Sequence, residues 1–461
     1  MAEITLEKVK GLLAREEERY ARERPESKEL YEKACHHYVG GVPMSWMRIW
    51  PGGFPIFVRE AEGAKLVDVD GHTYLDLCLG DTGALLGHSP PALIGPLAEQ
   101  LGKGITTMLP HEGCIEVGKE LSRRFGLPFW QVLMTASDAN RMALKVAREF
   151  TGRRLILAFN ASYHGSVDET LVVDFYGNLL NMPGLMGPLV EDPSTMTRIV
   201  EFNDVEALEE ALSPRDVACV ITEPVMTNVG IIHPEPGFHE TLRSLTRKYG
   251  TLLLIDETHS ICGGPAGMTG ELNLEPDIFV LGKLIAGGYP AAVLGFSREI
   301  AEMVARRVPW HNFFGFGGTL SGNPPAVAAI KATLDHLLTE ESFAHMIPLA
   351  RKMEEGIAAV IERHSLPWYV GRVGCRVEFR FLSEPPRRGI DTLMDVEYNE
   401  VDLISEGLTG PLEALIHVYC TNRGILLSPV HDMALVSPVT TEEDVDHYVR
   451  VVGECVEELV N

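Results

Sequence analysis

A lysine and a carboxylate each follow a short, largely apolar run in the second half of the chain. Lys283 comes two residues after the run 278–281, and Asp256 directly follows the run 251–255. Both runs are typical of buried strands, so the amine and the acid would stand at neighbouring strand ends. Chemistry on a pyridine aldehyde needs this pair, because the amine forms a Schiff base and the carboxylate keeps the ring nitrogen protonated. Taken alone, the Lys283 segment fits an ordinary solvated loop lysine equally well.

The elements that would position this pair alternate between strand and helix from about residue 90 to 335. Helical spacing is clearest at 137–151 and 238–249. Such alternation predicts an α/β fold with a mostly parallel sheet covered on both faces, and ligands of such sheets bind at the carboxyl ends of the strands. The sequence offers seven candidate strands: 132–135, 154–159, 198–202, 218–222, 251–255, 278–281 and 292–295.

The segments on either side of this region have a different pattern. Residues 5–23 predict an amphipathic helix, and 65–77 predict a strand, a turn and a returning strand. Beyond residue 336 we expect a long helix at 342–363, short strands at 376–381 and 424–427, and a closing helix with a capping box from Thr440 to Glu443. We therefore divide the chain into an N-terminal part (1–75) that packs with a small α+β domain (336–461), and a large domain (76–335).

Composition narrows the classes of partner. The 461 residues carry a formal net charge of −25, which argues against nucleic acid and anionic membrane surfaces as partners. No apolar run is long enough for a membrane span, and residues 1–34 are charged and helical in pattern, so no signal peptide is expected. The eight cysteines are scattered without a C-x-x-C pair, which speaks against a metal site. We expect a cytoplasmic protein.

Four further segments carry side chains or backbone suited to the same chemistry. A small-residue loop at 134–140 opens a helix and could bind a phosphate through backbone N–H groups and a hydroxyl. An aromatic ring after the next strand could stack on a flat ring. An acid and an amide follow the strand 218–222, and a glycine-rich turn at 317–324 could meet a phosphate. The side chains concerned are Ser137, Tyr163, Glu223, Asn228 and Thr319.

Each of these segments also has an ordinary explanation as a turn, a loop or a core aromatic, and for each one alone that explanation is the more common. Together they place an amine, an acid, a phosphate cup and a stacking ring at the strand ends of one sheet.

In order and spacing, these segments resemble the class III aminotransferases of the fold-type-I pyridoxal-phosphate enzymes. Within that class the chain is similar to the glutamate-1-semialdehyde aminomutase branch. The resemblance covers nearly the whole chain, and its motifs stand at 40–42, 68–71, 86–88, 135–140, 163–165, 223–224, 236–238, 256–257, 281–283, 318–324 and 427–429.

The resemblance implies pyridoxal 5'-phosphate as cofactor and gives the residues their roles. Lys283 would form the Schiff base and later shuttle a proton, and Asp256 would pair with the pyridinium nitrogen. Glu223 would lie near the Schiff base. The other residues that would contact the cofactor are Ala136 and Ser137 (phosphate), Tyr163 (stacking), Asn228 (ring hydroxyl), and Gly318 and Thr319 (the phosphate of a second subunit). The last two imply an obligate homodimer with shared active sites.

The chain also departs from the family pattern. Ala136 stands where the family usually has glycine, and residues 258–260 replace the usual stretch after the acidic pair. The arginine that holds the substrate carboxylate in the aminomutase is matched only by Arg48, one residue out of step. The segment 431–433 is shorter than in the aminomutase.

These departures lead us to expect a transaminase that moves an amino group from an amine or amino acid to a keto acid such as pyruvate. A bulky apolar or aromatic amine, or a β-amino acid, is indicated as donor by Met44, Trp46, Met47 and Trp50, although these side chains could equally pack against the core. The alternatives are a glutamate-1-semialdehyde 2,1-aminomutase and a non-catalytic protein of this fold. Lys283 and Asp256, both present, argue against the second alternative.

Overall fold

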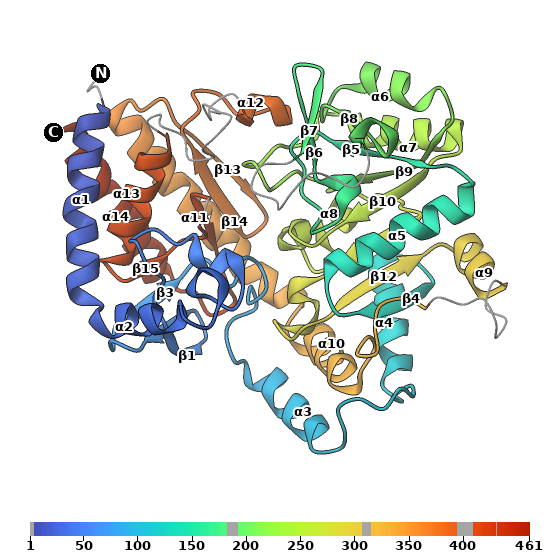
Figure 1. The fold of residues 1–461 in the computed structure, drawn as a ribbon, viewed down its shortest axis with the longest axis horizontal. Helices are drawn as coiled ribbons and strands as arrows, with labels where there is room; N and C mark the ends of the chain where they lie inside the picture. The colour runs from blue at the N-terminus through green and yellow to red at the C-terminus, as the bar shows by residue number, and fades with distance from the viewer. Residues whose placement is uncertain (1–3, 182–191, 307–314, 394–408, 430) are drawn as a thin grey trace.

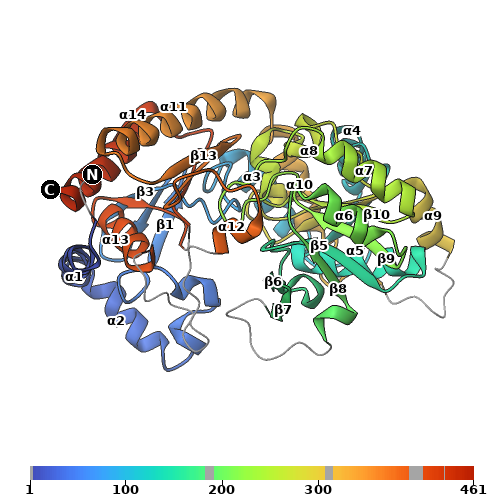
Figure 2. The same cartoon turned by 90° about the horizontal axis from the view of Figure 1, so that it is seen from above.

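The computed structural model describes residues 4–181, 192–306, 315–393, 409–429 and 431–461. Two lobes lie side by side (Figures 1 and 2). One is built around a large sheet, and the other gathers the two ends of the chain. No helix among the residues described is both long and apolar enough to cross a bilayer.

The large sheet has seven strands, as the sequence predicts. Their order is β4-β12-β11-β10-β9-β5-β8, and only β12 runs against its neighbours. Every predicted strand is present within a few residues. The bounds are β4 (Phe129–Leu133), β5 (Leu155–Phe159), β8 (Thr197–Val200), β9 (Val217–Thr222), β10 (Leu252–Asp256), β11 (Ile278–Leu281) and β12 (Ala292–Phe296). Asp256 is thus the last residue of a central parallel strand.

Helices cover both faces of this sheet (Figure 2). One buried cluster joins the sheet to α5 (Ala136–Thr151) and α9 (Arg298–Arg306), and another joins it to α6 (Val205–Leu212) and α7 (Phe238–Tyr249). This double cover explains why all six residues of β9 are buried and why its sequence is a continuous apolar run. The lobe also contains α3 (Pro91–Leu101), α4 (Cys114–Phe125), α8 (Gly267–Glu271), α10 (Pro324–His336) and the hairpin β6 (Val172–Phe175) with β7 (Asn178–Asn181).

The other lobe contains two small sheets. In the first, β1 (Val58–Glu62), β2 (Lys65–Asp68) and β3 (Thr73–Asp76) are joined by β15 (Ile425–Leu426) from near the end of the chain. In the second, β14 (Arg376–Arg380) lies between β13 (Tyr369–Val373) and β16 (Met433–Leu435). The helices are α1 (Leu6–Glu23), α2 (Pro25–Ala34), α11 (Glu340–His364), α12 (Gly389–Leu393), α13 (Thr409–Thr421) and α14 (Glu442–Val460).

A buried arginine fastens the two ends of the chain together. Arg24 donates to Tyr74 Oη at 2.8 Å, to Asn422 Oδ1 at 2.9 Å and to the carbonyl of Thr421 at 3.0 Å. Burying the guanidinium is tolerable because its donors are satisfied in this way. These contacts and the shared β1–β3 and β15 sheet support our division of the chain, whose boundaries remain a proposal.

Several helix starts differ from the sequence prediction, and α11 begins at Glu340, two residues before the predicted start. The capping box of α14 joins Thr441 to Asp444 and not Thr440 to Glu443. Both pairs have the right spacing, but the Thr440 hydroxyl is buried and accepts a hydrogen bond from Ser437 N at 2.9 Å. Helix α5 begins at Ala136, one residue before the prediction, and its N-cap is Thr135.

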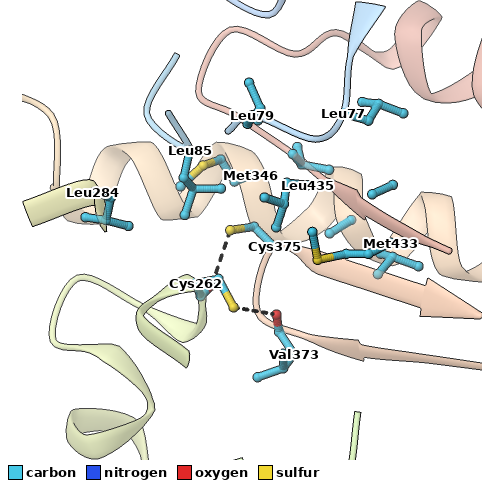
Figure 3. Packing of buried hydrophobic residues seen from close by; sticks show 14 of the residues in the cluster. Leu77, Leu79, Leu85, Cys262, Leu284, Met346, Val373, Cys375, Met433 and Leu435 are labelled. Atoms are coloured by element: carbon cyan, nitrogen blue, oxygen red, sulfur yellow. Dashed lines mark hydrogen bonds between the residues drawn. The ribbon is translucent and has the colours of Figure 1, made fainter. Parts of the chain in front are cut away.

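The apolar core between the two lobes lies directly beside the lysine and the segment after Asp256. Figure 3 shows Cys262 of the large lobe next to Cys375 of the small lobe, with Leu79, Leu284 and Leu435 in the same buried cluster. Cys262 Sγ donates to the carbonyl of Val373 at 3.4 Å, and Cys375 Sγ donates to the carbonyl of Cys262 at 3.3 Å. The backbone on either side of the candidate site is therefore anchored in a shared core.

Candidate active site

The carboxylate of Asp256 is buried, and a side-chain amide, a histidine ring nitrogen and a backbone N–H group hold it in place. Oδ2 accepts from Asn140 Nδ2 at 2.8 Å and lies 3.0 Å from His164 Nδ1, and Oδ1 accepts from Thr258 N at 3.1 Å. Burial alone would raise the pKa of Asp256, but the hydrogen bond and charge of His164, helped by Thr258 and Asn140, lower it to about 2. The side chain is thus a fixed anion across the neutral pH range.

Lys283 follows β11 at the start of a short 3-10 turn (Lys283–Ala286), with a φ of 47°. This left-handed conformation is unusual for a lysine and is held by the buried residues that follow, Leu284 to Ala286. The ammonium donates to Asp81 Oδ2 at 2.6 Å and to His259 Nε2 at 2.7 Å. It thus lies, like Asp256, at the carboxyl end of the sheet, where the sequence predicted both groups.

The N-terminus of α5 lies where the sequence predicts a phosphate cup. Ala136 and Ser137 are the first two residues of the helix, where the backbone N–H groups have no partner within the helix. Two glycines keep the space beside them open: a Cβ at Gly282 would lie 2.8 Å from the Ala136 Cβ, and one at Gly165 would lie 2.2 Å from the Ser137 Oγ. The cup therefore fits a phosphate, and alanine in place of the family's glycine leaves it intact.

Tyr163, Glu223 and Asn228 lie together beside this cup. Asn228 Nδ2 donates to Glu223 Oε1 at 3.3 Å and approaches the carbonyl of Tyr163 at 3.5 Å. Glu223 also accepts from the hydroxyl of Thr227 at 2.5 Å. Burial raises the pKa of Glu223, against the hydrogen bonds from Thr227, so this carboxyl holds a proton more readily than an exposed glutamate.

The segment 43–50 borders the site of its own chain. The ring of Trp46 meets that of Tyr163 edge-on, with centroids 6.3 Å apart. Met44, Trp46 and Met47 are exposed, whereas Trp50 packs with the small cluster around Tyr74. Three of the four apolar side chains are therefore exposed, one of them (Trp46) against Tyr163, and the fourth belongs to the core. Arg48 is also exposed and lies over Gly40.

Gly318 and Thr319 are exposed in the single chain and lie in the loop before α10. Their place in the sequence predicts contact with a second subunit, and the structure of one chain leaves them accessible for it.

Several residues of the site were not predicted from sequence. Asp81 and His259 contact the lysine, and His164 and Asn140 contact Asp256. The sequence could have pointed to His164 and Asn140, because they fall within the motif segments 163–165 and 135–140. For His259 the signal was the departure at 258–260. Asp81 lies 202 residues before its partner lysine, and no local pattern points to it.

Within the described parts of the chain, no group of three His, Cys, Asp or Glu side chains is arranged to hold a metal ion. The arrangement instead presents an amine, a fixed anion opposite a phosphate cup, and an aromatic ring. Those are the groups that a pyridoxal phosphate cofactor requires.

The fold and these groups define a fold-type-I pyridoxal-phosphate enzyme. The chain belongs to the class III aminotransferase family, whose model matches residues 49–396. It is 34% identical to the glutamate-1-semialdehyde 2,1-aminomutase of Thermus thermophilus, over 94% of this chain and 99% of that protein.

The chain also resembles a solved structure, a glutamate-1-semialdehyde-aminomutase from Pseudomonas aeruginosa, with a TM-score of 0.94 and 45% identity over 99% of both chains. A second structure of that enzyme, a lysine-to-alanine variant with the same identity, TM-score and coverage, is a complex with PMP.

These comparisons correct one conclusion from the sequence. The expectation of a transaminase with a keto acid acceptor is wrong, because the relatives that share 30 to 45% identity over more than nine tenths of the chain are aminomutases and favour the alternative that the sequence had left open. The motifs could not separate the two activities because both reactions need the same cofactor, held by the same lysine, acid and phosphate cup.

Proposed function

We propose that this protein is a glutamate-1-semialdehyde 2,1-aminomutase. The observation that supports this proposal best is the 45% identity over 99% of both chains to the Pseudomonas enzyme. The lysine and the buried carboxylate at the carboxyl end of the sheet agree with it. The reaction is an isomerisation within one substrate, so it consumes no separate keto acid.

The residues of the site would share the work. When bound, pyridoxal phosphate supplies an aldehyde that takes up and returns an amino group and a ring that withdraws electrons. Asp256 would keep the ring nitrogen protonated, since its carboxylate is ionised at neutral pH. Ala136 and Ser137 would hold the phosphate, Tyr163 would stack on the ring, and Asn228 would face the ring hydroxyl.

Proton movement would be assigned to two side chains. Nζ of Lys283 would take the proton from the carbon that bears the amino group and deliver it back. Glu223 is buried and accepts a hydrogen bond from Asn228. It would keep the hydrogen-bond network around the lysine nitrogen in place during this transfer.

The substrate's own carboxylate also needs an anchor. Arg48 is the candidate, because its turn carries Trp46, which touches Tyr163 at the edge of the site. A guanidinium can bind a carboxylate through two parallel hydrogen bonds.

We also propose a homodimer in which Gly318 and Thr319 of one subunit meet the phosphate bound by the other. The exposed apolar side chains Met108 (74%), Leu109 (73%) and Leu320 (50%) are suited to such an interface. The expected cytoplasmic location rests on composition alone.

The test is turnover with glutamate 1-semialdehyde as the only substrate. The holoenzyme should convert it to the isomeric α-aminoketone over many turnovers without any keto acid, as followed by product formation. Turnover that stops after one equivalent and resumes only when pyruvate or 2-oxoglutarate is added would contradict the proposal and restore the transaminase.

A further inference from the structure

The environment of the Lys283 ammonium includes two groups to which the functions above assign no role. Asp81 and His259, which we call the Asp81–His259 pair, accept hydrogen bonds from Nζ at 2.6 and 2.7 Å. His259 lies in the stretch 258–260, where the chain departs from the pattern of its family. The two residues come from different segments of the large lobe and converge on a single nitrogen.

The imidazole of His259 is an acceptor at the nitrogen that faces the lysine. Burial and the charge of Lys283 lower the pKa of His259 to about 3, so the ring is neutral. Nζ lies 2.7 Å from Nε2 and 3.5 Å from Nδ1 of this neutral ring, so we take Nε2, at the shorter contact, as the acceptor. Nδ1 lies 3.3 Å from the hydroxyl of the fully buried Thr82, which holds the ring in this orientation.

The carboxylate of Asp81 is a fixed anion that solvent can still reach. Desolvation raises the pKa of Asp81, but the ammonium of Lys283, together with His259 and His431, holds that pKa well below its usual range. The side chain is 46% exposed, so a ligand can approach it. The other charged groups that act on His259 are Arg376 and Asp256.

The backbone that carries Asp81 is rigid. Leu79, Asp81 and Thr82 all have positive φ angles of 45 to 77°, a strained arrangement for side chains of this kind. Leu79 and Thr82 are fully buried, and Leu79 packs in the core shared by the two lobes (Figure 3). A loop held in this way offers the carboxylate in a defined position.

An aminomutase brings a second amino group to this place. C1 of the substrate is reduced from aldehyde to amine and C2 is oxidised from amine to ketone, so the molecule is isomerised with no outside oxidant. C1 would take its nitrogen from the cofactor in its amine form, and the nitrogen of C2 would later restore that form, so midway the substrate carries amino groups on neighbouring carbons. Two such nitrogens lie only about 3 Å apart. While one nitrogen is held at the cofactor, the other can take the place that the Lys283 ammonium occupies here, 2.6 Å from the Asp81 carboxylate.

We propose that the Asp81–His259 pair is a receptor for the second amino group of the substrate in its diamine form, and that in this structure the receptor is filled by the ammonium of Lys283. The proposal rests on the aminomutase activity proposed above. The pair retains the molecule between the two halves of the reaction, when loss of the diamine would leave the cofactor in the wrong form.

The test compares the binding of 1,2-diaminoethane and propylamine to the pyridoxal-phosphate-loaded enzyme through the change in cofactor absorbance. The two amines have the same number of heavy atoms, and only the first has a second amino group. For Asp81→Asn, the ratio of the two affinities should fall by about tenfold or more relative to the wild type, since a charged partner is lost at a partly desolvated site.

Control variants separate a direct effect from a general one. Asp446→Asn makes the same charge change at an exposed ion pair with Lys352 and should leave the ratio unchanged. His259→Leu should lower the ratio, and His259→Gln, which keeps an acceptor, should restore most of it. A folded Asp81→Asn protein with the wild-type ratio would overturn the proposal.

The two proposals fail in different ways. An enzyme that does not isomerise glutamate 1-semialdehyde, but whose diamine preference depends on Asp81, refutes the proposed activity and supports the ammonium receptor. An enzyme that isomerises the substrate, and whose diamine preference survives Asp81→Asn and His259→Leu, refutes the receptor alone.

Discussion

At the scale of single residues, the site depends on an anion kept in a buried position. Asp256 has no cationic lysine or arginine among its hydrogen-bond partners in the described chain; His164, Asn140 and Thr258 hold it. Because its pKa is lowered, ionised Asp256 contributes stability that is present above the unfolded pKa and is lost only as the pH falls toward about 2. The acidic limb of any activity profile above pH 5 must therefore arise from another group.

We expect Asp256→Asn to lower turnover by about 100-fold or more, since a charge fixed beside the reacting group is commonly worth that much. The measurement is the single-substrate rate of the holoenzyme, with thermal unfolding to confirm that the fold is kept. Lys283→Ala should abolish turnover altogether. A near-normal rate for either folded variant would remove that residue from the mechanism.

At the scale of elements, strand β14 carries a buried ion pair toward the site. Arg376 donates to Glu378 Oε2 at 2.8 Å and to the carbonyl of Thr227 in the large lobe, and His431 Nδ1 lies 3.2 Å from Glu378 Oε1. Burial would raise the pKa of Glu378, but Arg376 and His431 lower it to about 2. The stabilisation from this carboxylate is complete above its unfolded pKa of about 4.5 and is lost as the pH falls toward 2.

Glu378→Gln should lower the free energy of unfolding by about 3 kcal/mol or more at pH 7, because it leaves Arg376 as a buried charge without an anion. The difference from the wild type should shrink at pH 3, which lies below the unfolded pKa of about 4.5, because much of the advantage of the wild-type carboxylate is already lost there. Denaturant unfolding at both pH values measures this. Glu454→Gln, at an exposed pair with Arg450, serves as control and should cost about 1 kcal/mol or less. Equal stability of Glu378→Gln and the wild type at pH 7 would contradict the argument.

At the scale of the whole molecule, the single chain leaves part of its predicted site accessible. The loop with Gly318 and Thr319 leads into α10, and α10 packs against α3 and α4, which are joined by the segment with Met108 and Leu109. Exposed apolar side chains on both segments would be covered in a dimer.

We expect the protein to have twice the chain mass of 50.8 kDa in solution, as measured by light scattering. Leu320→Asp should shift it toward the monomer and weaken cofactor retention at the same time, because a buried carboxylate without a partner opposes association. A wild-type monomer that retains the cofactor fully would show that Gly318 and Thr319 act within their own chain or not at all.

The sequence alone determined the frame of this protein. All seven strands, Asp256 and Lys283 at strand ends and the helix opening at Ala136 follow from local features: apolar runs, helical spacing and small residues at a turn. Each of these signals is contained within a single element or turn, so it can be recognised without knowledge of the fold. The cap of α14 could not be predicted in this way. Thr440 and Thr441 both have an acidic residue three positions later, and only the burial of Thr440 leaves Thr441 to form the capping box.

Only the tertiary structure decided what surrounds the reactive lysine. Asp81 reaches it across 202 residues, through a loop held in left-handed backbone conformations by the core between the lobes, and His259 becomes an acceptor because burial keeps its ring neutral. Contacts of this kind arise from the packing of distant segments, so no periodic pattern in the sequence indicates them. The choice between transaminase and aminomutase came from neither source but from comparison with relatives over nearly the whole chain, because the motifs serve the cofactor that both activities share.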